Sequence, residues 1–252
     1  VTVGGAGVNG RRFDIAYEQS SGRCVVVYSN NTTGTIAYRI WDGSSWAAAA
    51  TKTTVWLSAI PNDIRLATRT TPGSNELAAA IADANSPAVL TALVWDGTAW
   101  GNEPSAGALS TAVYRSAVTG DTPAFDAAYE SNSGRLVVVN SINGANGVAY
   151  HQYVAPTWTS NTLTSTRPHG AVSLTANPDA ASNQILLVAS RITGNNTIYQ
   201  GVWSGSAWSA WTQSVTLSAN YAVNRLPFAG AWLRSGATTA AVVFYDGNTS
   251  NR

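Results

Sequence analysis

The 252-residue sequence predicts an all-β fold, a β-propeller of four-stranded antiparallel blades, on three observations. A unit of about 50 residues recurs along the chain. Each unit contains short runs of β-branched and aromatic residues separated by turn-forming Gly, Asn, Asp and Ser residues. No segment keeps a 3.6-residue apolar period, so helix content should be near zero. Four short strands in each repeat are typical of a propeller, in which one unit makes one blade.

The repeat is clearest in two segments of matching sequence. FDIAYEQSSGRCVVVYSN begins at Phe13 and FDAAYESNSGRLVVVNSI begins at Phe125, and degenerate copies begin at Ile64, Val172 and Phe228. A second landmark, W-D-G-x-x-W or a degraded form of it, follows in the first four units and ends at Trp46, Trp100, Trp158 and Trp208. We therefore expect one propeller domain over residues 1–252, with five or six blades and an incomplete last blade.

Unit one illustrates the strands that we expect in each blade. They are residues 13–18, 23–28 and 35–41, followed by a further β-rich pass near 53–57, and the Ser-Ser-Gly at 20–22 predicts a tight turn. Asp42 and Asp96 should cap Asp-Gly turns, with the neighbouring tryptophans packed between blades. By alignment with Leu136, Cys24 should be a buried and unreactive thiol.

Opposite charges alternate between the first strands of successive units. Alternate residues of a strand face opposite sides, which puts Asp14 and Glu18 of unit one on one face. Unit three repeats them as Asp126 and Glu130. Unit two has arginines at the corresponding positions, Arg65 and Arg69. We predict two sets of inter-blade ion pairs that line the central channel: Asp14, Arg65 and Asp126, and separately Glu18, Arg69 and Glu130.

The repeating tryptophans have two interpretations. Trp46, Trp100, Trp158 and Trp208 are suited to packing between blades, because large aromatic side chains bury the most area. As an alternative, the same four rings are candidates for stacking on sugar rings, which would make the protein a multivalent lectin. Packing is the preferred interpretation.

Composition excludes several classes of function. Charged residues make up 11% of the chain against about 25% in an average soluble domain, and the net charge is +1, so no nucleic-acid partner is expected. No run of about 20 apolar residues predicts insertion into a membrane. His151 and His169 have no partner at metal-ligand spacing, so we expect neither a metal nor a cofactor. No catalytic motif is present, and Tyr17 and Glu18 are adjacent on a strand, so they face opposite sides and do not form a sialidase-like pair.

The motifs F-D-x-A-Y-E, S-G, V-V-V-Y and Y-R-x-W-D-G-x-x-W in tandem resemble those of secreted bacterial tandem-repeat β-propeller proteins, and more distantly lectin and sialidase propellers. The resemblance implies an extracellular or cell-surface protein, with other copies of itself or surface-assembly proteins as partners. We expect a non-catalytic structural or adhesive module of a surface or filament assembly, cut from a longer polypeptide. A multivalent carbohydrate-binding lectin is the alternative hypothesis, and a sialidase-like glycoside hydrolase is a third and less favoured one.

Overall fold

The computed structural model describes residues 10–114, 123–191, 197–217, 228–233 and 239–244, and every regular element in them is a β-strand. The strands form five antiparallel sheets, which we number as blades 1 to 5. Blade 1 contains β1 (Phe13–Tyr17), β2 (Cys24–Ser29), β3 (Thr35–Trp41) and β4 (Ala50–Thr53). Blade 2 contains β5 (Pro61–Thr68), β6 (Leu77–Asp83), β7 (Ala88–Trp95), β8 (Trp100–Gly101) and β9 (Ser110–Val113). Blade 3 contains β10 (Phe125–Tyr129), β11 (Leu136–Ser141), β12 (Val148–Val154) and β13 (Thr157–Leu163). Blade 4 contains β14 (His169–Ala176), β15 (Ile185–Arg191), β16 (Thr197–Trp203) and β17 (Thr212–Thr216), and blade 5 contains β18 (Phe228–Trp232) and β19 (Ala240–Phe244).

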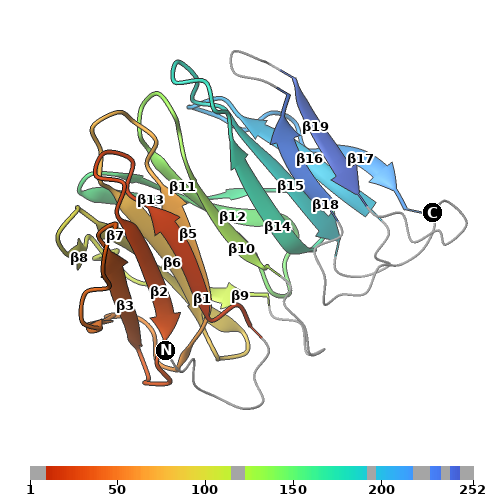
Figure 1. The fold of residues 1–252 in the computed structure, drawn as a ribbon. Coiled ribbons are helices and arrows are strands. Elements are labelled where there is room, and N and C mark those ends of the chain that lie inside the picture. The colour runs from red at the N-terminus through yellow and green to blue at the C-terminus, as the bar shows by residue number, and fades with distance from the viewer. Residues whose placement is uncertain (1–9, 115–122, 192–196, 218–227, 234–238, 245–252) are drawn as a thin grey trace, which may run out of the picture.

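The blades follow one another in chain order. Their first strands, β1, β5, β10, β14 and β18, are neighbours in that sequence, and Figure 1 shows blade 1 and blade 5 at opposite ends of the row. Within blades 1, 3 and 4 the strand order is that of a simple meander, while in blade 2 both β8 and β9 pair with the edge of β7 opposite β6, β8 near Trp95 and β9 near Ala88. The protein is a β-propeller of antiparallel blades, as the repeat predicts, and blades 1, 3 and 4 have the four strands expected of each blade. Among the described residues, no helix has the length and hydropathy to cross a membrane.

Each blade has two faces that its strand alternation defines. One face of blade 1 carries Phe13, Ile15 and Tyr17 and is exposed. In blades 2 to 5 the equivalent face packs on the preceding blade, and we call it the backward face in every blade. The opposite face, with Ala16 and Glu18, looks toward the next blade and is the forward face. All four junctions in the chain therefore place a forward face on a backward face.

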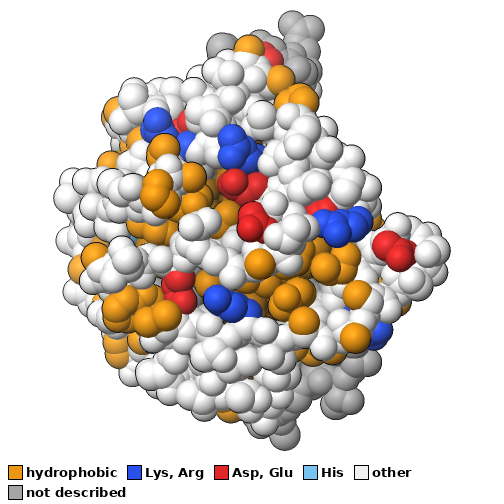
Figure 2. Space-filling model, turned by 90° about the vertical axis from the view of Figure 1, so that its left-hand side faces the viewer, with side chains coloured by type: hydrophobic (Ala, Val, Ile, Leu, Met, Phe, Trp, Pro, Cys, Tyr) orange, Lys and Arg blue, Asp and Glu red, His pale blue; other side chains and the backbone are white. Residues whose placement is uncertain are grey.

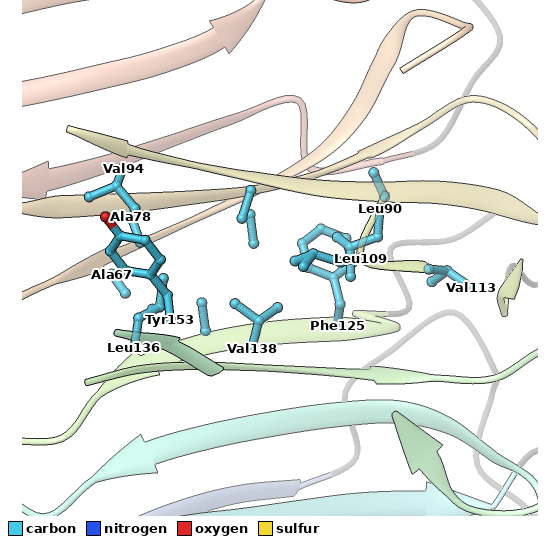
Figure 3. Close-up of a cluster of buried hydrophobic side chains, with 14 of the residues drawn as sticks. Ala67, Ala78, Leu90, Val94, Leu109, Val113, Phe125, Leu136, Val138 and Tyr153 are labelled. Atoms are coloured by element: carbon cyan, nitrogen blue, oxygen red, sulfur yellow. The ribbon is translucent and has the colours of Figure 1, made fainter. Parts of the chain in front are cut away.

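Alternation divides one buried strand between two cores. All seven residues of β6 are buried. Leu77, Ala79 and Ile81 pack against blade 1, whereas Ala78, Ala80 and Ala82 pack against blade 3. Figure 3 shows the second of these layers, where Phe125 and Tyr153 of blade 3 reach toward the alanine-rich face of blade 2. Similar layers lie between blades 3 and 4 and between blades 4 and 5.

The Asp-Gly turns form as the sequence predicts. The Asp42 carboxylate accepts hydrogen bonds from the Ser44 and Ser45 amides, each at 2.8 Å. Asp96 accepts equivalent bonds from the Thr98 and Ala99 amides, and the Thr98 hydroxyl together with these amides lowers the pKa of its carboxyl. Gly97 has a φ of 99°, which glycine adopts without strain.

A buried carboxylate joins blade 1 to blade 2. Trp95 Nε1 of blade 2 donates to Glu18 Oε1 of blade 1 at 2.6 Å, and Glu18 is 1% exposed. Arg23 donates to both oxygens of the same carboxylate, at 2.7 and 2.8 Å, and reaches across to the Gly97 carbonyl at 2.6 Å. Burial alone would raise the pKa of Glu18, but the hydrogen bonds from Arg23, Ser21 and Trp95 together lower it.

Blade 3 joins blade 4 through the same set of residues. Trp203 Nε1 donates to Glu130 Oε1 at 2.5 Å, and Arg135 donates to the Gly205 carbonyl at 2.7 Å. The residue types match those at the first junction one for one, so the structural repeat is a pair of blades rather than a single blade.

Glu18→Ala is expected to lower the free energy of unfolding by about 3 kcal/mol, because it leaves the Trp95 N–H buried and removes the partner of Arg23. Glu18→Gln should lose less, since its amide oxygen still accepts from Trp95. Urea denaturation of both variants measures the difference. Equal losses in the two variants would contradict the importance of the Trp95 contact.

Candidate functional site

The junction between blades 2 and 3 differs from the two junctions that a buried Glu seals. It holds a pocket of about 240 Å³, the Arg69 pocket, lined by Arg69, Glu76, Ser133, Gly134, Arg135, Tyr153, Val154 and Ala155. At this position Arg69 takes the place that Glu18 and Glu130 occupy in blades 1 and 3. A pocket remains because no tryptophan from the next blade fills the space.

A surface-accessible ion pair forms the polar side of the pocket. Arg69 Nη1 lies 3.2 Å from Glu76 Oε2, and the two side chains are 29% and 19% exposed. The carboxylate fixes one edge of the guanidinium. Arg69 thus presents donor groups, and Glu76 presents acceptor oxygens, side by side at the same opening.

Gly134 gives Arg69 the room to lie against blade 3. Its φ is 69°, and a Cβ at this position would lie 2.3 to 2.5 Å from the Arg69 guanidinium. The equivalent Gly22 of blade 1 has nearly the same φ, 71°, but nothing lies within 4 Å of its added Cβ. The same turn therefore has a guanidinium against it in blade 3 and open space in blade 1.

Tyr153 and the turn after it form the apolar side of the pocket. Tyr153 is 3% exposed and its ring packs on Trp158 at 5.0 Å between centroids. Burial raises the pKa of Tyr153, and the charge of Glu76 adds to that effect while Arg69 opposes it. The phenol is therefore a neutral group beside the ion pair.

A second hollow lies on the other side of the β12–β13 turn. This Trp158 groove has a volume of about 570 Å³ and is lined by residues 104–109 of blade 2 and by Pro156, Thr157, Trp158 and Ser160 of blade 3. Trp158 Nε1 donates to the Asn102 carbonyl at 2.8 Å. The pocket includes Val154 and Ala155 and the groove includes Pro156 and Thr157, so one turn separates the two hollows.

A chain of hydrogen bonds from Asn140 through His151 holds Ser160, which lines the groove. The Asn140 side-chain nitrogen donates to the Ser141 carbonyl. This contact orients Asn140 so that its Oδ1 lies 2.9 Å from His151 Nε2. His151 therefore carries its proton on Nε2, and Nδ1 accepts from the Ser160 hydroxyl at 2.7 Å. Burial lowers the pKa of His151 to about 4, so the ring is neutral at pH 7.

The junction between blades 4 and 5 lacks this charge. Asn177 and Gln184 take the places of Arg69 and Glu76, and their amides are 3.3 Å apart. The hollow at this junction, about 160 Å³, is lined by a different set without charged side chains, which includes Leu186, Gln200 and Trp232. Among the described junctions, the ion-paired pocket thus belongs to blades 2 and 3.

The four tryptophans that the sequence analysis names as candidates for stacking on sugar rings lie in different environments. Trp46 is 43% exposed, with the Arg39 guanidinium 5.8 Å from its ring centroid. Trp100 is 4% exposed and packs beside Trp95, so its ring faces the core and is closed to a ligand. Trp158 and Trp208 are half-buried, and Trp158 lines the groove.

The outer set of charges, Glu18, Arg69 and Glu130, pairs differently from the expectation. Each forms its ion pair within its own blade: Glu18 with Arg23, Arg69 with Glu76, and Glu130 with Arg135. The reason is distance along the hairpin, because the next strand of the same blade brings an opposite charge closer than the adjacent blade does. Basic and acidic side chains also lie beside one another on the surface in Figure 2, between patches of hydrophobic side chains.

In the inner set, Asp14, Arg65 and Asp126, the two aspartates each bind a backbone amide of the next blade. Asp14 Oδ2 accepts from the Leu66 amide at 2.8 Å, and Asp126 Oδ2 accepts from the Leu174 amide at 2.8 Å, each across a junction. Asp14 also pairs with Arg11. Burial raises the pKa of Asp126, which the backbone hydrogen bonds and the charges of Arg65 and Arg11 oppose.

Several residues of the site have no place in the sequence predictions. Glu76, Tyr153, Ser133 and Arg135 line the pocket, and Arg23 is the counterpart of Arg135 in unit one. The repeat alignment contains a signal for the two arginines, which precede the V-V-V strand in both units. Cys24 is buried as expected, and burial raises the pKa of its thiol. Within the described residues, no three His, Cys, Asp or Glu side chains gather in a way that would hold a metal ion.

No family model matches the sequence, and no curated protein matches it. Among solved structures, the SapL1 lectin in complex with α-methyl fucoside is similar at a TM-score of 0.53 and 16% identity, over 92% of this chain and 71% of its own. A fungal lectin from Aleuria aurantia with a six-bladed β-propeller fold gives 0.46 and 13%, over 82% of this chain and 61% of its own. The NanB sialidase from Streptococcus pneumoniae gives 0.45 and 13%, over 71% and 27%. This chain spans about three fifths of the fungal lectin, and the likeness to these structures is one of fold.

Stability should fall as the pH falls from about 6.5 to about 4. Burial lowers the pKa of both His151 and His169 to about 4, and the charge of Arg191 adds to the effect at His169. The unfolded chain, whose histidines have a pKa near 6.5, therefore takes up protons in this window that the folded chain does not. The urea midpoint between pH 7 and pH 4.5 measures the loss. A double variant, His151→Gln with His169→Gln, should show a flatter profile over that window, and an unchanged slope would contradict this origin.

Proposed function

We propose that this chain is a non-catalytic, carbohydrate-binding β-propeller, an extracellular adhesive module whose ligand occupies the Arg69 pocket. The observation that carries the proposal is the pocket itself, where a partly exposed Arg–Glu pair lies beside a buried tyrosine at a blade junction. Small-molecule sites are concave and combine an apolar lining with a few fixed polar groups. This pocket has both.

The polar groups of the pocket suit the hydroxyl groups of a sugar. Each hydroxyl of a saccharide is both a donor and an acceptor, and neighbouring hydroxyls point in related directions. Arg69 offers N–H donors and Glu76 offers carboxylate oxygens, so a pair of adjacent hydroxyls can be bound by the two side chains together. Val154 and Ala155 also line the pocket, and they offer an apolar surface to the C–H face of a sugar ring.

The volume of the two hollows favours more than one sugar unit. The pocket of about 240 Å³ is of the size of a monosaccharide, and the Trp158 groove of about 570 Å³ begins on the other side of the short turn. Trp158 provides an aromatic wall there. We therefore place a terminal sugar in the pocket and a following residue of the glycan over the turn, toward the groove.

A binding role is favoured over glycoside hydrolysis by the lining of the pocket. Most glycosidases use two carboxyl groups that flank the scissile bond. The Arg69 pocket is lined by one carboxylate, Glu76, and that group is already ion-paired. The solved lectin with α-methyl fucoside shares the fold, and it makes fucosides a natural first ligand to test.

Arg69→Ala is expected to reduce glycan binding at least tenfold, because it removes the donors and leaves Glu76 without its partner. Glycan-array screening, with fucosides included, identifies a ligand, and titration calorimetry then measures the affinity of each variant. Arg167→Ala replaces an exposed arginine outside the pocket and serves as the control. The site would be excluded if Arg69→Ala bound the ligand as tightly as the unaltered protein does.

Gly134→Ala is expected to weaken binding, whereas Gly22→Ala should not. Both glycines have a φ near 70°, so both substitutions carry a similar backbone cost of about 1 to 2 kcal/mol. In Gly134→Ala alone, the new methyl group meets the Arg69 guanidinium and displaces it from the pocket. Equal binding by two variants of equal stability would show that the position of Arg69 does not matter.

A further inference from the structure

The backward face of blade 1 is the exposed counterpart of a face that is buried elsewhere in the chain. Phe13, Ile15 and Tyr17 are 50%, 49% and 60% exposed. Their equivalents in blade 3, residues 125, 127 and 129, are 2%, 9% and 2% exposed, because blade 2 covers them. The same residue pattern thus lies in a core at one place and at the surface at another.

The turn beside this face is open in the same way. In blade 3 the Arg69 guanidinium of the preceding blade lies against Gly134, and in blade 1 nothing lies near Gly22. Both the apolar face and its flanking turn therefore have the form of a junction that lacks its partner blade.

The forward face of blade 5 is the second uncovered face in the described residues. Ala229 and Ala231 of β18 are exposed, and Val243 of β19 pairs with Ala229 and is 70% exposed. Leu233, which follows β18 on the same side, is 63% exposed. The opposite face of this blade, with Phe228 and Trp232, packs against blade 4.

The two uncovered faces are complementary in size. Blade 1 offers two aromatic rings and an isoleucine, and blade 5 offers mainly alanine with one leucine and one valine. The junction between blades 2 and 3 combines the same two types of surface, since Phe125 and Tyr129 lie against Ala67, Ala78 and Ala80. Large side chains on one face and small ones on the other allow two sheets to interdigitate.

The two faces lie at opposite ends of the row of blades (Figure 1), so they do not meet within one chain. We infer that the backward face of blade 1 in one copy binds the forward face of blade 5 in a second copy. This contact is of the same kind as the four junctions inside the chain. Because it joins two different surfaces, it leaves one of each kind free at the ends of a dimer, and it permits head-to-tail growth.

Two single substitutions test the contact. Ile15→Glu places a charge on the exposed face of blade 1, and Ala231→Glu places one on the exposed face of blade 5. Sedimentation velocity over a wide range of protein concentration should show association of the unaltered chain and a single-chain mass for each variant alone. An equimolar mixture of the two variants should form dimers of defined size, because each variant keeps the face that the other has lost. Circular dichroism verifies that both variants remain folded.

Three results would overturn the inference. The first is an unaltered chain that does not associate at any concentration. The second is dimerisation of Ala231→Glu alone, which would place blade 1 against blade 1. The third is a mixture of the two variants that remains monomeric. A second measurement uses Ile15→Cys with Ala231→Cys in a Cys24→Ala background. Oxidation should link chains into a ladder on denaturing gels, and a disulfide formed only within one chain would mean that the ring closes on itself.

Discussion

Burial of both faces of every blade is the constraint from which the rest of the structure follows. A sheet packed between two others can accept few charged side chains, because an unpaired charge in such a layer costs several kcal/mol. The seven buried residues of β6 show the result, with an alternation that supplies larger side chains to one junction and alanines to the other. The low charge content of the chain, 11%, is the composition that this architecture requires.

The few charges that the blades do contain are held by multiple hydrogen bonds. Glu18 and Glu130 each accept from a tryptophan of the next blade and pair with an arginine of their own. These contacts seal the first and third junctions and make blade pairs the true repeat. The second junction has no such carboxylate, and Arg69 there pairs with Glu76 of its own blade on the wall of a pocket. The site thus arises where the repeat alternates, at the junction between two sealed pairs.

The fold was predictable from the sequence because its evidence is repetitive and local. F-D-x-A-Y-E and the Asp-Gly turns recur in order, and a turn such as Asp42 to Ser45 forms from residues within a few positions of one another. The pocket was not predictable in the same way. Glu76 reaches Arg69 from the next strand of the hairpin, and Trp100 is buried because of the face on which it lies. Spacing along the first strand identified which charges alternate between blades but not which partner lies nearest to each.

The Arg69 pocket and the exposed faces of blades 1 and 5 are connected by the number of binding sites that an assembly presents. The Arg69 pocket gives one binding event per chain. Association costs translational and rotational freedom, and for a ligand of the size of a monosaccharide this cost offsets a large share of the contact energy. If chains join from blade 1 to blade 5, each added copy brings another pocket in a fixed relative position. The second binding event on a multivalent surface then occurs at a high effective concentration, which can raise avidity by a factor of about 10² to 10⁴ without any new contact in the pocket. On this argument the proposed adhesive role and the inferred assembly follow from one property of the chain, since the same alternation of blade faces that leaves the Arg69 pocket open also leaves the exposed faces of blades 1 and 5 complementary.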